Sequence, residues 1–481
     1  MSRRLVTVLF GTRVSGGLPA AWPPPPPSNY GRPGRLWLLQ WLSALACLSA
    51  VVGSVHALPH SDPSPCPSCL VAGAASVDVT PPVGVPLAGY GGPARRLLLP
   101  DLLDRHPLAF WFKPSEGVHD PIMARALLLQ FGAVRLLWIS VDLIAVDSDM
   151  VQDLKTRLAA SGFTYASIIV SASHTHSGPG TFARSWLFEA LALDRHVPAV
   201  REQLLKGIAD AARLAEARKR PARVGVGRGE VRGIIKSRVN LPTDPEVGVL
   251  KVVGETGTPV ALVWNYAIHG TVLGPRNRLL SGDVMSAVSE TLERALRAPA
   301  LYTNGAVGDV SPSRKGWEGV RDTSEALARG VRAVWSRTPL ERSARLSVVT
   351  EQIALPPPRL SVRNCVGRLV PVRVRLGLSW AMPRTTEMVG VAIGDSAWVT
   401  VPGELQTRLG QAVKARGRQI FPLAFVAGLS NDYLGYFLTP EEFAKGGYIG
   451  CVALYGEEGG QLLADRAEEI FRKLRAASAR R

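Results

Sequence analysis

The chain has 481 residues, of which 46% are hydrophobic and 20% are charged. This ordinary globular composition excludes a chain that is disordered throughout. Lys and Arg outnumber Asp and Glu by 56 to 39, which gives a formal net charge of +17. Such an excess suits an anionic membrane surface, an acidic substrate or nucleic acid. The sequence has no zinc-finger, helix-turn-helix or RNA-recognition signature, so we expect no nucleic-acid partner.

Residues 1–57 form an N-terminal extension. Within it, residues 36–55 (LWLLQWLSALACLSAVVGSV) carry no charge and follow Arg32 and Arg35. A basic flank, an apolar stretch and a small-residue site ending at Ala57 are typical of a signal peptide. The stretch is also long enough to span a bilayer as an uncleaved anchor. We therefore expect an exported protein that is periplasmic, secreted or anchored to the membrane by this segment.

A linker is predicted at residues 58–75, and a single catalytic domain at residues 76–481. In this second part, apolar runs alternate with amphipathic helical patterns. The predicted strands are 126–130, 136–141, 165–170, 247–253, 260–266 and 389–401. The predicted helices are 149–160, 199–218, 284–298, 324–335, 405–416 and 460–476. This alternation predicts an α/β fold in which mixed β-sheets are flanked by helices.

The strand at 165–170 is followed by the string SASHTHSGPG at residues 171–180. In extended backbone, residues two apart point the same way, so His174 and His176 project together from the strand end. The Gly-Pro-Gly that follows forces a turn and lets the backbone approach a ligand closely. Two such histidines indicate either a metal site or a pair of hydrogen-bonded histidines without a metal.

Three further segments place a polar group directly after an apolar strand. His269 lies in AIHG and is a ligand, a base or a buried histidine bonded to backbone. Ser311 lies in GDVSP, where free backbone N–H groups suit a nucleophile or an oxyanion, although a structural turn uses the same residues. Glu404 lies in PGE at a helix start, where the helix dipole alone favours a carboxylate. Loops at sheet ends often hold functional sites, so these segments favour the metal-site interpretation.

The motifs follow the order and rough spacing found in one enzyme family. The strings SHTHSGPG, AIHGTVLG, GDVSP, PGE and GLSNDYLGY, with DVTP and GVHDP nearer the N-terminus, resemble the neutral/alkaline non-lysosomal ceramidases. The resemblance extends from about residue 75 to the C-terminus. It implies zinc-dependent hydrolysis of the amide bond of ceramide or a related N-acyl lipid. It also implies that this chain lacks the family's C-terminal β-sandwich domain.

A ligand set is implied by the same resemblance. One Zn²⁺ per chain would be bound by His174, His269, Glu404 and Tyr436, with Tyr433 as the alternative to Tyr436. Two imidazoles and two oxygens are a set that zinc accepts while it leaves room for water or substrate.

Four catalytic residues are implied as well. His176 would lie near the metal without binding it, and with Arg238 and Tyr448 it would hold the oxyanion and protonate the leaving amine. Ser311 would either attack the substrate or orient water and the substrate hydroxyl.

Two departures from the family pattern leave the substrate open. Ser313 and Ile449 stand where Asn and Glu are usual. We therefore keep three hypotheses: a hydrolase of N-acyl lipids, a zinc hydrolase of another amide or ester, and an inactive membrane-associated binding protein with the same fold.

Two further features concern the surroundings of the site. The apolar loop at residues 97–112 would line a lipid entrance, rest on a membrane or simply pack against the protein. A lipid substrate would be met at a membrane surface. Cys365 and Cys451 would be able to form a disulfide in an oxidising compartment.

Overall fold

The computed structural model describes residues 69–341, 344–367 and 374–479, and all of them fall within the unit Asp62–Arg481. The predicted extension, with its apolar segment 36–55, lies outside the described residues. The predicted linker ends too late, because the first strand already begins at Leu70. Residues 70–75 are buried in a sheet, where their backbone pairs with that of residues 126–131. Along the described part of the chain, no helix has the length and apolar character needed to cross a membrane.

The described elements follow one another as strands and helices in alternation. The strands are β1 Leu70–Asp78, β2 Gly117–Val118, β3 Met123–Phe131, β4 Val134–Val141, β5 Ser167–Ala172, β6 Arg220–Glu230, β7 Ile235–Ser237, β8 Glu246–Gly254, β9 Pro259–Tyr266, β10 Leu279–Leu280, β11 Ala300–Asn304, β12 Val310–Pro312, β13 Leu346–Ala354, β14 Arg359–Ser361, β15 Arg375–Gly377, β16 Thr385–Ile393, β17 Ser396–Thr400, β18 Glu404–Leu405, β19 Leu423–Ala427 and β20 Tyr436–Phe437. The helices are α1 Ser148–Ala160, α2 Trp186–Phe188, η1 Glu189–Leu193, α3 Pro198–Ala217, α4 Asp283–Leu296, α5 Gly316–Arg337, α6 Val362–Val366, α7 Thr407–Gly417, α8 Pro440–Lys445, α9 Gly447–Cys451 and α10 Gly456–Ala479.

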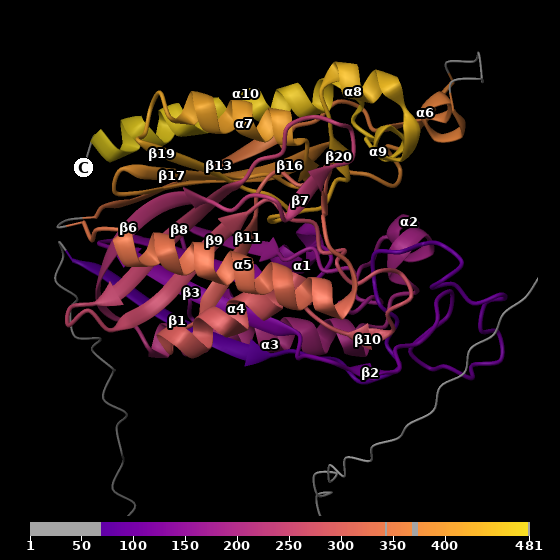
Figure 1. Ribbon diagram of the computed structural model, residues 1–481, viewed down its shortest axis with the longest axis horizontal. Helices are drawn as coiled ribbons and strands as arrows, with labels where there is room; N and C mark the ends of the chain where they lie inside the picture. Colours follow the sequence, from indigo (N-terminus) through magenta and orange to yellow (C-terminus); the bar gives the residue numbers. More distant parts are fainter. Residues whose placement is uncertain (1–68, 342–343, 368–373, 480–481) are drawn as a thin grey trace, which may run out of the picture. The chain divides into compact units, whose positions relative to one another are not determined.

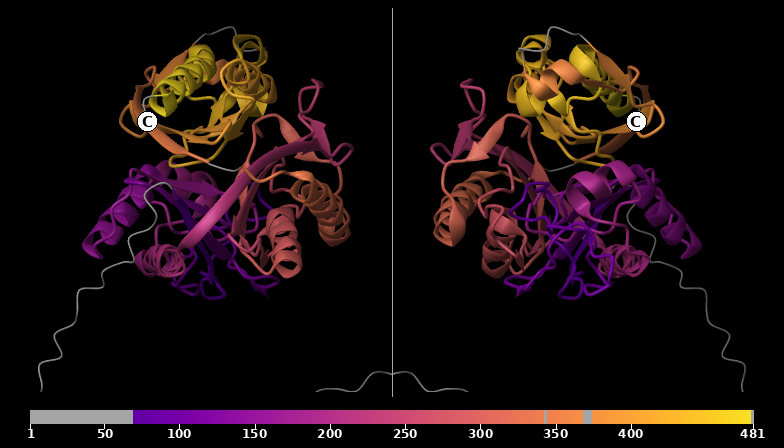
Figure 2. Two further views of the ribbon diagram at one scale, coloured as in Figure 1. Left: turned by 90° about the vertical axis from the view of Figure 1, so that its left-hand side faces the viewer. Right: turned by 90° about the vertical axis from the view of Figure 1, so that its right-hand side faces the viewer.

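Two sheets pack face to face between two layers of helices (Figures 1 and 2). The larger sheet has eight strands in the order β11-β9-β8-β6-β1-β3-β4-β5, and the smaller has four in the order β13-β16-β17-β19. Helices α1, α3, α4 and α5 cover the outer face of the larger sheet, and α7 and α10 cover that of the smaller. Trp138 and Trp398 meet edge to face between the sheets with ring centroids 5.4 Å apart. A strand such as β4 is apolar on both faces because it is covered on both.

The predicted fold class is confirmed by this arrangement of mixed sheets and flanking helices. All six predicted helices have counterparts, although α5 begins eight residues before the predicted start at Ser324. The predicted single strand 389–401 is wrong, because the chain turns at Gly394 and forms the hairpin of β16 and β17. Gly394 has φ +56°, a left-handed conformation that glycine adopts easily.

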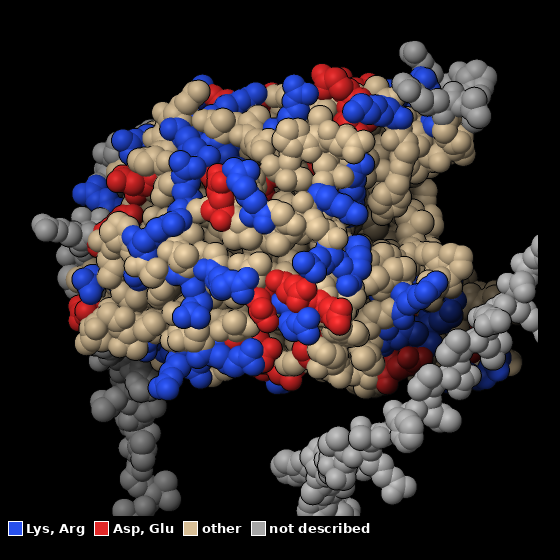
Figure 3. Space-filling model, in the orientation of Figure 1, with Lys and Arg blue, Asp and Glu red and all other residues tan. Residues whose placement is uncertain are grey.

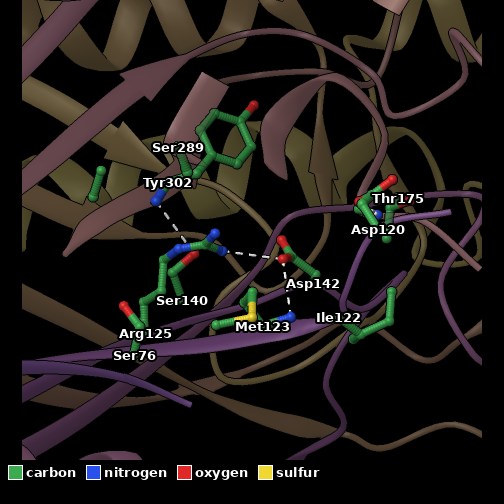
Figure 4. Close-up of polar contacts among 12 residues, drawn as sticks. Ser76, Asp120, Ile122, Met123, Arg125, Ser140, Asp142, Thr175, Ser289 and Tyr302 are labelled. Carbon is green, nitrogen blue, oxygen red and sulfur yellow. Dashed lines mark hydrogen bonds and ion pairs between the residues drawn. The ribbon is translucent and has the colours of Figure 1, made fainter. Parts of the chain in front are cut away.

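A buried ion pair joins the larger sheet to its helices and to the loop after β4. Arg125 on β3 donates to Asp142 at 3.0 Å and to Glu293 on α4 at 2.8 Å, and the Arg125 and Asp142 side chains are each 2% exposed. Figure 4 shows the guanidinium pointing at the Asp142 carboxylate, which also accepts from the backbone N–H of Met123 at 3.1 Å. Burial raises the pKa of the Asp142 carboxyl, so the paired cation is needed to keep it ionised. The pair therefore fixes the backbone immediately before residues 143 and 144.

We expect Arg125→Met to reduce the free energy of unfolding by about 3–5 kcal/mol, because it leaves a buried carboxylate without its cation. Urea unfolding of the two proteins measures this difference. The control is Arg157→Met, which removes a more exposed pair with Glu202 and should change stability by less than about 1 kcal/mol. Equal effects of the two substitutions would contradict the assigned role of Arg125.

Candidate active site

The site lies where strands of both sheets end. Three parallel pairs, β4 with β5, β9 with β11 and β17 with β19, bring their carboxyl ends to one region. Isolated backbone bridges join the segments beyond these ends: Ser171 with Ser430, and Asn304 with Gly428. The Asn304 side chain also donates to the carbonyl of Ala172 at 2.9 Å. Segments far apart in sequence are therefore held together by main-chain contacts before any catalytic side chain is considered.

His174 is held in one orientation by the loop that follows β4. Its Nδ1 lies 2.7 Å from the carbonyl oxygen of Ile144, and its backbone N–H donates to Leu143 at 2.9 Å. The residue has φ +66°, an uncommon conformation for a non-glycine residue. Backbone strain of this kind persists where the surrounding structure imposes it, and it is frequent at functional sites. The side chain is 1% exposed.

Three imidazoles form one compact group. A ligand nitrogen from each of His174, His176 and His269 lies within 4.8 Å of the others, and all three residues are buried. The Nε2 atoms of His176 and His269 are 3.1 Å apart. Two glycines make room for this group, because a Cβ at Gly270 would lie 2.2 Å from the His174 carbonyl oxygen and one at Gly89 would lie 2.5 Å from His176 Nδ1.

Glu404 brings a buried carboxylate to the same group from the smaller sheet's side. Its Oε1 is 3.3 Å from His174 Nε2, and its Oε2 is 3.6 Å from His269 Nδ1. The short parallel pair of β18 and β20 sets Glu404 opposite Tyr436. Tyr433 donates its hydroxyl hydrogen to Glu404 Oε1 at 2.8 Å. Burial and the nearby Glu404 charge raise the pKa of both phenols well above the ordinary value.

The polar atoms of this group fit a bound cation. The Ile144 carbonyl oxygen beside His174 Nδ1 can only accept a hydrogen bond, so we assign the ring hydrogen to Nδ1. His174 Nε2 then carries a lone pair. That lone pair faces a carboxylate oxygen, and His174 Nε2 and Glu404 Oε2 are both buried without a hydrogen-bond partner. Two acceptors facing each other repel unless a cation or a proton lies between them. Imidazole nitrogen and carboxylate oxygen are both ligands that bind zinc in proteins.

Burial favours the neutral forms of His176 and His269. Burial, followed by the neighbouring His174 and Arg238, lowers the pKa of His176 well below its usual range. Burial and the same Arg238 charge also lower the pKa of His269. Neutral imidazole is the form that binds a metal or accepts a proton.

A small sheet of β7 and β12 brings Arg238, the residue after β7, close to Ser311 on β12. Arg238 Nε donates to Ser311 Oγ at 2.8 Å, and its NH1 donates to the Tyr436 hydroxyl at 3.4 Å. The backbone N–H of Arg238 donates to the carbonyl of Asp309 at 2.7 Å. The Ser311 oxygen thus accepts from a cation and keeps its own hydrogen free to donate. A hydroxyl held in this way suits binding and orientation of a substrate oxygen.

Tyr448 lies at the open side of the group on α9. It is 68% exposed, and its ring centroid is 6.0 Å from that of Tyr436. A disulfide between Cys365 on α6 and Cys451 ties α9 in place, so the pairing that the sequence left open is present in the structure. The Asn364 side chain adds hydrogen bonds to the carbonyls of Phe443 and Gly450.

All eight predicted site residues lie in this constellation. The positions of two residues, His176 and Tyr433, differ from the expected ones. His176 is as much part of the compact group as the predicted ligands His174 and His269, and Tyr433 makes the direct hydrogen bond to Glu404. Two further residues contact this group and were not among the predicted site residues, Tyr90 and Arg95. The Tyr90 ring lies 4.8 Å from that of His176, and Arg95 donates to the His176 carbonyl at 3.2 Å. The Gly-Tyr motif at residues 89–90 was the available signal.

Comparison with known proteins agrees with the motifs. Residues 111–327 match the model of the family described as neutral/alkaline non-lysosomal ceramidase, N-terminal. These residues belong to the neutral/alkaline non-lysosomal ceramidase family. The resemblance inferred from the motifs is thereby confirmed. The matched ceramidase segment contains the three histidines, Arg238 and Ser311, whereas Glu404, Tyr436 and Tyr448 lie beyond it.

Individual neutral ceramidases are distant relatives. The neutral ceramidase of Mycobacterium tuberculosis is 27% identical over 234 residues, which are 42% of this chain and 36% of that protein. Neutral ceramidase B of Dictyostelium discoideum is 22% identical over 475 residues, covering 71% of this chain and 66% of that protein. The chain therefore matches less than two thirds of the length of these curated relatives. The crystal structure of the neutral ceramidase from Pseudomonas aeruginosa shares the fold, with a TM-score of 0.73, 18% identity, and coverage of 85% of this chain and 75% of that one.

We expect the full chain to bind about one Zn²⁺, and His174→Ala to weaken its affinity by more than about 100-fold, since loss of even an outer-shell partner costs 10–100-fold. Competition with a zinc-binding dye measures the affinity. His106→Ala, at an exposed histidine, is the matched control and should bind zinc as the parent does. Equal affinity in all three proteins would place the metal elsewhere.

We expect Cys365→Ser with Cys451→Ser to speed amide hydrogen exchange across residues 446–452, because α9 loses its covalent tie to α6. Exchange followed by mass spectrometry measures this, with the buried part of α10 as the internal control. Unchanged exchange at α9 would mean that the Asn364 hydrogen bonds alone hold it.

Proposed function

We propose that this protein is a zinc-dependent amidohydrolase that cleaves the amide bond of ceramide or a related N-acyl lipid, releasing a fatty acid and a sphingoid base. One observation carries the proposal: the buried Glu404 carboxylate faces unpartnered imidazole nitrogen in a chain of the ceramidase family. Residues 76–481 would form the catalytic domain. Segment 36–55 would direct export or anchor the protein in the membrane.

His174, His269 and Glu404 would hold the zinc ion, with Tyr436 or Tyr433 as the fourth donor. When bound, zinc would lower the pKa of a water molecule to about 7 and polarise a carbonyl oxygen. His176, neutral because it is buried, accepts the proton of the attacking water and passes it to the leaving nitrogen. Water oxygen becomes part of the carboxylic acid as the carbon–nitrogen bond breaks.

Arg238 supplies fixed positive charge to the other side of the reacting group. Its guanidinium already contacts Ser311 and Tyr436, so it is oriented before substrate binds. Preoriented donors stabilise a developing oxyanion without a cost of reorganisation during the reaction. Ser311 offers its free hydrogen to a substrate oxygen, and Tyr448, exposed at the opening, contacts the substrate as it enters.

We expect the full chain with zinc to hydrolyse a fluorescent N-acyl sphingosine, and chelation or His174→Ala to lower the rate by roughly 10³-fold or more. The reason is that Lewis-acid stabilisation contributes several kcal/mol, and each 1.36 kcal/mol is tenfold in rate. Zinc added after chelation should restore the parent but not the variant, and His106→Ala should keep parental activity.

A matched set of simple acyl amides and esters tests the substrate class. Hydrolysis of these compounds without hydrolysis of the sphingolipid would favour a zinc hydrolase with another substrate. Zinc binding without turnover of any compound would favour the inactive binding protein. Turnover that is insensitive to chelation and to His174→Ala would overturn the mechanism.

A further inference from the structure

Four leucines of the loop between β1 and β2 project into solvent. Leu98, Leu99, Leu102 and Leu103 are 103%, 78%, 78% and 74% exposed. Single exposed leucines are common on soluble proteins, but a cluster within six residues is not, and such patches mark interaction surfaces. We call residues 98–103 the leucine loop.

The leucine loop is anchored by a folded base. The buried Asp194 carboxylate accepts the backbone N–H groups of Phe110, Trp111 and Phe112 at 2.9–3.0 Å. The Leu97 N–H donates to the Trp111 carbonyl at 3.1 Å. Since the base is so extensively bonded, the leucines are held outward by structure and do not simply lack a place to pack.

The same chain segment leads directly to the active site. Tyr90 contacts the His176 ring, and Arg95 donates to the His176 carbonyl. The Gly89 N–H donates to Ala192 at 2.9 Å, which ties the segment to η1. Figure 1 shows the indigo loop between β1 and β2 on the same side of the unit as α2 and α9. The loop that carries the leucines thus lies on the same side as α9, the helix that carries Tyr448.

A second exposed apolar feature lies beside this segment. Trp186, on α2, stacks on Trp380 with ring centroids 5.0 Å apart, and the two residues are 54% and 65% exposed. Phe188, two residues after Trp186, lies 5.5 Å from the ring of Tyr433, which bonds to Glu404. Apolar and aromatic side chains therefore continue from the outer surface to the edge of the metal-binding group.

Basic residues outnumber acidic ones along the segment that carries the leucines. Arg96 lies over the Phe112 ring and Arg195 over the Phe110 ring, each at 4.6 Å. Residues 95–113 contain three Arg and one Lys against Asp101 and Asp104. Residues 58–481 retain a net charge of 17 − 5 = +12, because residues 1–57 contain five Arg and no acid. Basic side chains outnumber acidic ones on the face in Figure 3. Apolar side chains flanked by cations match an anionic bilayer surface, where leucines reach the acyl region and cations stay with the headgroups.

We propose that the leucine loop inserts into the interface of membranes containing anionic phospholipid and so presents the site opening to the bilayer. The occupant is the lipid surface itself. Only the benefit of docking rests on the proposed function: docking would let an N-acyl lipid pass from the bilayer to Tyr448 without crossing water.

The first test is amide hydrogen exchange of the full chain with vesicles. Vesicles of phosphatidylcholine mixed with phosphatidylglycerol should slow exchange in residues 97–104 at least about twofold, whereas phosphatidylcholine alone should have little effect. Residues 209–217 of α3 are the internal control. Binding of the protein to the anionic vesicles without protection of the leucine loop would overturn the proposal, even if segment 36–55 holds the chain on the membrane.

The second test uses Leu98→Ser with Leu99→Ser. This double variant should bind anionic vesicles roughly tenfold more weakly or worse, because two apolar side chains no longer enter the lipid. Leu214→Ser, at an exposed leucine of α3, is the control and should bind as the parent does. Unchanged thermal unfolding checks that both variants fold.

Two substrates separate docking from catalysis. The double variant should hydrolyse ceramide embedded in anionic vesicles at least about tenfold more slowly, yet cleave a short-chain ceramide dispersed in detergent at the parental rate. Equal loss on both substrates would overturn docking in favour of a direct effect on the site. Protection of the loop that depends on protein concentration without vesicles would assign the leucines to a dimer. If vesicles protect the leucine loop from exchange but the chain cleaves neither substrate, docking would be supported and the proposed function would be wrong.

Discussion

The site depends on one electrostatic constraint: a buried carboxylate and an imidazole lone pair that face each other need a cation or a proton between them. Glu404 and His174 are each 1% exposed, and their facing atoms are acceptors. Burying such a charge is costly unless it is paired or coordinates a metal. The backbone carbonyl of Ile144, which fixes the tautomer of His174, is therefore as important as the imidazole, because it leaves the lone pair directed at Glu404. The Arg125–Asp142 pair matters for the same reason, since it fixes the loop that carries this carbonyl.

The face-to-face sheets explain how such a group is assembled. The histidines follow β5 and β9 of the larger sheet, and Ser311 lies on β12, a short strand after β11. Glu404 follows β17 of the smaller sheet, and Tyr433 and Tyr436 follow β19. Bridges such as Asn304 with Gly428 join the two sets through backbone atoms. A site built across two sheets retains its geometry only while the core between them stays packed. The Trp138–Trp398 contact is accordingly a structural support of the chemistry, although neither ring is near a reacting atom.

The outside of the site is organised for a different environment. Its inner part is buried and polar, while the surface around it carries leucines, stacked tryptophans and basic side chains. A water-soluble substrate would gain nothing from this surface, but a lipid must leave a bilayer to be hydrolysed. The proposed chemistry and the proposed membrane docking therefore support each other, while resting on separate observations. The disulfide that holds α9 suits an exported protein.

The sequence by itself was sufficient for the α/β alternation and the family resemblance, and it named the polar side chains that the fold brings together. These features are local: apolar periodicity marks β4 or α3, and motifs such as SHTHSGPG place reactive residues at strand ends. Local patterns did not reveal the hairpin at Gly394, because β16 and β17 are both apolar and only chain reversal separates them. They also did not mark the early start of β1, whose Leu, Val and Ala residues follow a Pro- and Ser-rich run and become a strand by pairing with β3.

What only the tertiary structure decided is the relation among these side chains. Sequence spacing says nothing of the 3.3 Å between His174 and Glu404, which are 230 residues apart, or of the Tyr433 hydroxyl that donates to that carboxylate. The sequence alone also did not decide whether the apolar loop at residues 97–112 is buried or exposed. Whether a leucine is exposed depends on the neighbours that the folded chain provides. Here Asp194 binds the backbone at the base of the loop, whereas the leucines at its tip stay exposed.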